Sequence, residues 1–86
     1  MNLGKRFGDN LKRARRSAGL SQDELAMRAD VHRTEVSQLE CGRRLARIDT
    51  LVKLAASLEV GAEQLIAGID WTPSETRPGQ FREGDG

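Results

Sequence analysis

The 86-residue sequence predicts an all-α fold of five short helices followed by a short extended C-terminal tail. Apolar residues recur at helical spacing in five segments between residues 5 and 67, with glycines or turn-forming residues between them. Aromatic residues make up only 3% of the chain, so the core must be built from Leu, Ala, Val and Ile. That composition suits close-packed helices better than a β-sandwich. We therefore expect one compact domain over residues 1–69 and a separate tail over residues 70–86, where Pro, Gly, Thr and charged residues dominate.

Several functional classes are disfavoured by composition. Cys41 is the only cysteine, so it has no internal disulfide partner, and the Cys and His content gives no zinc-site spacing. We therefore expect no metal and no cofactor, and a reducing cytoplasmic location. The sequence has no apolar run near the roughly 20 residues of a membrane span and no signal-peptide core, so no membrane association is expected.

Charge is distributed unevenly although the chain carries a net charge of only +1. Residues 1–58 hold 12 Lys and Arg against 7 Asp and Glu, whereas residues 59–86 hold 2 against 6. A basic body with an acidic end is compatible with a polyanionic partner for the body. The alternative is that these charges simply solvate the surface.

The first predicted helix covers residues 5–18 and ends before Gly19. A narrow apolar stripe at helical spacing comprises Phe7, Leu11, Ala14 and Ala18. The outer face is basic and carries Lys5, Arg6, Lys12, Arg13 and Arg16.

Two short amphipathic helices follow within residues 21–42. Ser21 is a good N-cap for the first, over residues 22–29, and its buried face comprises Leu25, Ala26 and Ala29. Asp30 occupies the turn, because Asp tolerates a positive φ better than most residues. The second helix covers residues 32–40, with His32 as its N-cap and Glu35 as a capping-box partner.

The second of these helices has two different faces. Val36 and Leu39 lie on an apolar face, and the hydrogen-bonding side chains that point elsewhere are Arg33, Thr34, Ser37 and Gln38. Two helices joined by a short turn, the second with such a polar face, form a helix-turn-helix, which places a helix in the DNA major groove. A catalytic or metal-binding role for His32 is disfavoured because the sequence provides no partner for it.

Two further helices complete the predicted domain. The fourth, over residues 48–58, has a broad apolar face comprising Ile48, Leu51, Val52, Leu54, Ala55 and Leu58. The fifth covers residues 62–67, where Leu65 and Ile66 are expected to close the core, and Gly68 ends it.

The tail has features of extended structure. Ile69 and Trp71 alternate with polar residues, and Phe81 follows a turn signal at Pro78 and Gly79. We predict a short hairpin, or an extended arm that packs Trp71 and Phe81 on the domain or on a second subunit. The alternative is a disordered tail.

The residues just described resemble the phage-repressor and Cro type of helix-turn-helix protein, the Xre-like family, over about residues 5–68. The matching positions are Ser21, Gln22, Leu25, Ala26, Val31, Val36, Ser37, Leu39, Glu40, Gly42, Ile48, Thr50, Leu51, Leu54 and Ala55. The resemblance implies a five-helix, lambda-repressor-like domain that binds operator DNA as a homodimer. Asp30 departs from the usual Gly, and Ala46 from the frequent Pro.

The resemblance also implies roles for particular residues. The base-reading positions it implies are Arg33, Thr34, Ser37 and Gln38. The phosphate contacts it implies are Gln22, Arg43 and Arg44, helped by Arg13 or Arg16. Arg15 is expected to form a structural ion pair with Glu40, and a direct contact of Arg15 with phosphate is the alternative. The residues expected at the dimer or tail interface are Leu65, Ile69, Trp71 and Phe81.

Two function classes remain from the sequence. The first is a sequence-specific transcriptional regulator, most plausibly a repressor, that binds a pseudo-palindromic operator on double-stranded DNA as a homodimer. The second is an antitoxin or adaptor that holds a protein partner through its tail. An enzyme is a distant third, because nothing brackets a catalytic pocket in so small a helical domain.

Overall fold

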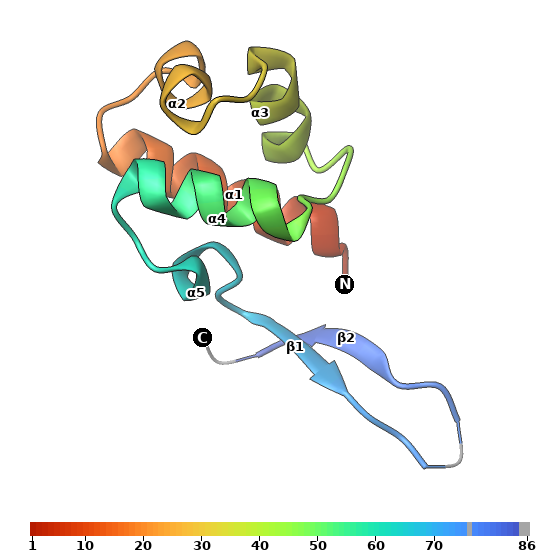
Figure 1. The fold of residues 1–86 in the computed structure, drawn as a ribbon. Coiled ribbons are helices and arrows are strands. Elements are labelled where there is room, and N and C mark those ends of the chain that lie inside the picture. Colours follow the sequence, from red (N-terminus) through yellow and green to blue (C-terminus); the bar gives the residue numbers. More distant parts are fainter. Residues whose placement is uncertain (76, 85–86) are drawn as a thin grey trace.

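The computed structural model describes residues 1–75 and 77–84 and confirms the predicted all-α domain with an extended tail. Its helices and strands are α1 (Leu3–Ser17), α2 (Gln22–Ala29), α3 (Arg33–Glu40), α4 (Ile48–Leu58), α5 (Ala62–Leu65), β1 (Ile69–Thr72) and β2 (Gln80–Glu83). Figure 1 shows α2 and α3 at one end of the molecule and the two strands at the other, with α1 and α4 between them.

The predicted helix boundaries are mostly explained by local capping. The Ser21 hydroxyl accepts from the Glu24 N–H, and Glu24 accepts from the Ser21 N–H, each at 3.0 Å, so a full capping box begins α2. Asp30 ends α2 with a φ of 55°, as expected for the turn. His32 is the N-cap of α3 but makes no side-chain capping bond, so the predicted capping box with Glu35 is wrong. Glu35 instead accepts from the Thr50 hydroxyl at 3.5 Å, because its side chain points toward α4.

The core lies among all five helices and contains mostly aliphatic side chains. The largest fully buried ones are Leu11, Leu25, Val36, Leu39, Leu54 and Leu65. The predicted apolar face of α4 was too broad, since Ile48 is 76% exposed and Val52 57% exposed. Ala18 and Ile66 are also exposed, contrary to expectation. α4 packs mainly against α2 and α5, and these two helices leave part of its apolar surface uncovered.

The tail forms the predicted antiparallel hairpin. β1 pairs with β2 so that Trp71 lies opposite Phe81, and their rings meet edge to face with centroids 5.1 Å apart. The hairpin is attached to the core at Ile69, and both aromatic rings remain about half exposed. Residues 76, 85 and 86 of the predicted tail lie outside the described residues. Because β1 and β2 pair with each other, the alternative of a disordered tail is wrong for these two strands.

Candidate nucleic-acid interface

The helix-turn-helix has the geometry that its sequence predicted. The Val31 N–H donates to the Ala26 carbonyl at 3.0 Å across the turn, and Val36 and Leu39 are fully buried. On the other side of α3, Arg33 and Thr34 are exposed, while Ser37 and Gln38 are partly exposed. The four predicted base-reading side chains therefore lie on the outer part of one helix.

Glu40 anchors the inner end of α3. Its buried carboxylate accepts from Arg15 Nε at 2.6 Å, from Arg15 Nη2 at 3.0 Å and from Gln22 Nε2 at 3.0 Å. Arg15 also donates to the Leu20 carbonyl at 2.8 Å. The expected Arg15–Glu40 pair is thus present, and it joins α1, α3 and the start of α2. The hydrogen bond that Arg15 donates to Glu40 raises the pKa of Arg15, against the opposing effect of its burial, so this guanidinium stays charged.

Two glycines of α1 let the backbone approach the end of α3. A Cβ at Gly8 would lie 2.5 Å from the Leu39 carbonyl oxygen and 2.6 Å from that of Glu40, and a Cβ at Gly4 would lie 2.8 Å from the Gly42 oxygen. Sequence reasoning missed this contact. Two glycines four residues apart inside a helix were the available signal, because such a pair is costly without a packing reason.

The three main candidates for phosphate contacts lie at both ends of the motif. Gln22 is the first residue of α2, and Glu40 engages one amide hydrogen of Gln22, which leaves the other amide hydrogen to donate elsewhere. Arg43 and Arg44 directly follow the left-handed Gly42, which turns the chain after α3. Both arginines are exposed, and Arg44 Nη1 donates to Gln38 Oε1 at 3.2 Å. The structure therefore places Gln22, Arg43 and Arg44 next to α3.

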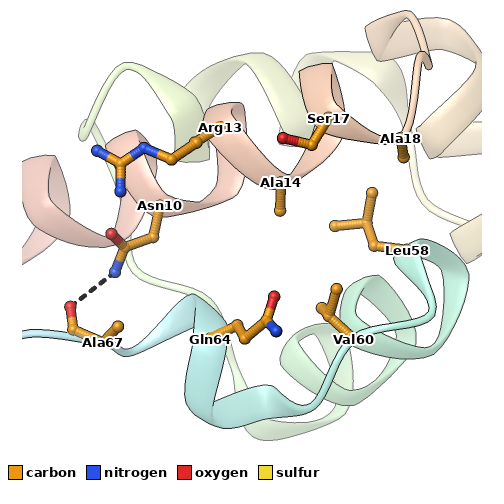
Figure 2. Close-up of a pocket in the computed structure, with 9 residues that line it drawn as sticks. All are labelled: Asn10, Arg13, Ala14, Ser17, Ala18, Leu58, Val60, Gln64 and Ala67. Atoms are coloured by element: carbon orange, nitrogen blue, oxygen red, sulfur yellow. Dashed lines mark hydrogen bonds between the residues drawn. The ribbon is translucent and has the colours of Figure 1, made fainter. Parts of the chain in front are cut away.

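Arg13 and Arg16 are placed differently. Arg13 lines a hollow of about 390 Å³ on the side of α1 that faces α5, together with Asn10 and Gln64 (Figure 2). Arg16 lines a second hollow, which is formed by α1 residues alone and is lined by Arg13 as well. Arg15 points to α3 instead, because residues two apart on a helix do not share a face. The structure does not group Arg13 and Arg16 with the candidate contacts around α3.

Asn10 is a buried polar residue that the sequence analysis did not single out. Its amide donates to the carbonyls of Leu65 at 3.0 Å and Ala67 at 2.9 Å, the second of which is drawn in Figure 2. Arg6 Nε also donates to Ala67 at 3.1 Å. These bonds satisfy carbonyls at the end of α5 and fix that helix on α1. The signal in the sequence for this buried position was a single Asn within one helical turn of apolar residues.

The candidate interface residues of the tail divide into two groups. Leu65 is fully buried within the single chain, so its assignment to a dimer surface was wrong and it belongs to the core. Ile69, Trp71 and Phe81 line an apolar groove of about 350 Å³. The other groove residues are Leu3, Phe7, Leu45, Ala46, Leu51, Ile66 and Asp70. This groove lies between the hairpin and the helical body.

Within residues 1–75 and 77–84, no group of three or more His, Cys, Asp or Glu side chains is placed to hold a metal ion. None of the helices in that part of the chain is long and apolar enough to cross a membrane.

Comparison with known proteins agrees with this geometry. The profile of the helix-turn-helix family matches residues 11–65. The HTH-type transcriptional regulator y4dJ of Sinorhizobium fredii is 39% identical over 77 residues, which cover 90% of this chain and all of that protein. Control protein C.BamHI of Bacillus amyloliquefaciens is 33% identical over 66 residues, 76% of this chain and 82% of that one. The crystal structure of the restriction-modification controller protein C.AhdI from Aeromonas hydrophila is similar with a TM-score of 0.70 and 32% identity, covering 72% of this chain and 94% of that one. The chain belongs to the helix-turn-helix family of DNA-binding transcriptional regulators.

Proposed function

We propose that this regulator binds a specific pseudo-palindromic operator as a homodimer and represses transcription by occupying it. The observation that carries the proposal is the two-sided character of α3. Its inner side is buried and tied down through Glu40, while its outer side presents hydrogen-bonding groups with no role in the core. A helix held in this way can enter the major groove without changing its orientation.

The side chains on the outer side of α3 have the chemistry for base recognition. Arg33 can donate to guanine O6 and N7, and the Thr34 methyl group can contact a thymine methyl. Gln22, Arg43 and Arg44 would bind phosphates and so fix the register of the protein on DNA without reading sequence.

A homodimer is supported by the apolar surface that a single chain leaves exposed. Trp71 is 53% exposed and Phe81 48% exposed beside the groove described above, and a two-stranded hairpin is only marginally stable alone. A symmetric dimer presents two identical reading helices, which explains why the operator would be pseudo-palindromic with half-sites about 34 Å apart.

Selection of bound sequences from a random DNA pool tests this function. We expect an enriched motif with two inverted half-sites about one helical turn apart. Arg33→Ala should lower affinity for the selected operator by roughly 1–3 kcal/mol while leaving random DNA almost unaffected. Arg43→Ala should weaken binding to both kinds of DNA equally. Equal losses on operator and random DNA for Arg33→Ala would contradict base reading by that residue.

A protein-interaction role, as in an antitoxin or adaptor, is the second candidate. The half-exposed aromatic pair of the hairpin favours it, because such a surface can also hold another protein. Analytical ultracentrifugation of the chain and of a Trp71→Ala/Phe81→Ala variant separates the two. If the wild type is a dimer and the variant a monomer, the homodimer is supported. If both have the same oligomeric state, the result favours binding of a different protein by this surface.

A further inference from the structure

Both of the longer candidate base-reading side chains contact a neighbouring charged residue. Arg33 Nε lies 3.3 Å from Asp23 Oδ1, and Arg44 Nη1 donates to Gln38 Oε1 at 3.2 Å. The Arg33 and Asp23 side chains are both more than half exposed. An exposed ion pair contributes little to folding stability. The consequence of the Arg33–Asp23 pair therefore lies in how it orients the Arg33 side chain.

The contact with Asp23 leaves a defined part of Arg33 available. A guanidinium carries five N–H donors in a planar fork and no acceptor. The Asp23 oxygen lies at the Nε position, and the terminal Nη1 and Nη2 atoms make no hydrogen bond within residues 1–75 and 77–84, so both can donate side by side. Among the bases, guanine alone offers two adjacent acceptors, N7 and O6, in the major groove. The pair therefore presents Arg33 in the form that matches guanine.

The contact with Arg44 restricts Gln38 in a similar way. Arginine only donates hydrogen bonds, so the atom of the Gln38 amide that faces Arg44 must be its oxygen. Recognition of adenine by glutamine needs both amide ends at the same base, with the oxygen accepting from N6 and the NH₂ donating to N7. While the oxygen is turned to Arg44, Gln38 offers the DNA its NH₂ donors alone. Those donors match the two acceptors of guanine better than the mixed edge of adenine.

We propose that Asp23 and Arg44 are positioning residues that make the reading surface of α3 a donor surface, and that each half-site consequently carries guanine opposite Arg33 and guanine opposite Gln38. The inference rests on the proposed function and specifies the DNA sequence class that the same site selects. Neither positioning residue needs to touch a base. Arg44 keeps its remaining N–H groups for phosphate.

Selection from a random DNA pool, followed by binding measurements on single-base variants of the selected site, tests the wild-type prediction. We expect guanine at two positions of each half-site, with Arg33→Ala and Gln38→Ala each relaxing one of them. A motif with adenine at the Gln38 position, or without guanine at the Arg33 position, contradicts the inference alone. A pool with no enriched motif contradicts the proposed function, and the inference falls with it.

Asp23→Asn separates positioning from simple charge repulsion. Loss of one negative charge near the phosphates should raise affinity for random DNA by about twofold. Loss of the Arg33 orientation should lower the preference for guanine at that position by about tenfold. Asp9→Asn is the matched control, because Asp9 also forms an exposed ion pair, 3.8 Å from Lys5, but lies on α1. If Asp23→Asn keeps the guanine preference and strengthens all sites equally, Asp23 only repels DNA.

Arg44→Ala and Arg43→Ala form the second comparison. Both remove one positive charge from the same loop, so both should weaken binding to all DNA and reduce its salt dependence. Only Arg44→Ala frees the Gln38 oxygen, and it should shift the preferred base at that position from guanine to adenine. An unchanged base preference in Arg44→Ala would show that Arg44 does not position Gln38.

Discussion

The helical body and the C-terminal hairpin differ in how completely they bury or hydrogen-bond their own side chains. In the body, six large aliphatic side chains are almost fully buried, and the buried Glu40 carboxylate has three hydrogen bonds. In the hairpin, both aromatic rings are about half exposed. The body can therefore hold its conformation alone, whereas the hairpin leaves apolar surface that the proposed dimer would cover. This difference suggests that DNA reading and association are carried by separate parts of the chain.

The largest loss of folding stability should come from removing Glu40, which anchors α3. Glu40→Ala leaves the largely buried Arg15 without its partner, and we expect unfolding to become easier by about 3–5 kcal/mol in urea denaturation. A double variant, Arg15→Met/Glu40→Met, should recover much of that loss, because no buried charge is left unpaired. A loss below about 1 kcal/mol for Glu40→Ala, as for an exposed pair, would contradict the anchoring role.

A smaller loss should follow from separating α1 and α3. Gly8→Ala places a methyl group against two backbone carbonyls, and we expect a cost of about 1–3 kcal/mol in the same measurement. Ser17→Ala on the exposed side of α1 is the control and should change stability by less than about 0.5 kcal/mol. If Gly8→Ala stabilises the protein, as helix propensity alone predicts, the two helices do not need this close approach.

The capping box of α2 should contribute less and should depend on pH. Ser21→Ala is expected to cost about 1 kcal/mol. Hydrogen bonds from the Ser21 backbone and hydroxyl lower the pKa of Glu24 below its ordinary value of 4.5. The Glu24 contribution is therefore present above about pH 4.5 and is lost as the pH falls through the lowered pKa. Unfolding measured from pH 7 to pH 3 should show this loss in the wild type and not in Glu24→Gln. Identical pH dependence in both proteins would contradict it.

Local signals in the sequence were sufficient to predict where the helices begin and end, but not how much of each helix surface is buried. Ser21, Asp30 and Gly19 mark helix ends through backbone chemistry that neighbouring residues decide, so their roles could be predicted. The apolar face of α4 was predicted too wide, because periodicity shows which side chains share a face and not how much of that face a neighbour covers. Ile48 and Val52 lie beyond the part that α2 and α5 cover.

The candidate site was predictable to a similar extent. The resemblance suggested the Arg15–Glu40 pair, but it gave no reason for Gly8, whose role depends on the backbone of Leu39 and Glu40, far from it in the sequence. Arg13 and Arg15 look equivalent in a run of basic residues, and only the packing of α1 separates the side facing α5 from the side facing α3. The contacts from Asp23 to Arg33 and from Arg44 to Gln38 join residues whose pairing has no sequence signature.

Binding of the Trp71→Ala/Phe81→Ala variant to one half-site and to the complete operator tests the division between body and hairpin most directly. The proposed reading surface lies on α3 in the body, so affinity for a single half-site should stay within about twofold of wild type. Affinity for the complete operator should fall by at least about tenfold, because the second half-site is no longer bound by a linked subunit. Loss of half-site binding, or undiminished affinity for the complete operator, would contradict the separation of the two regions.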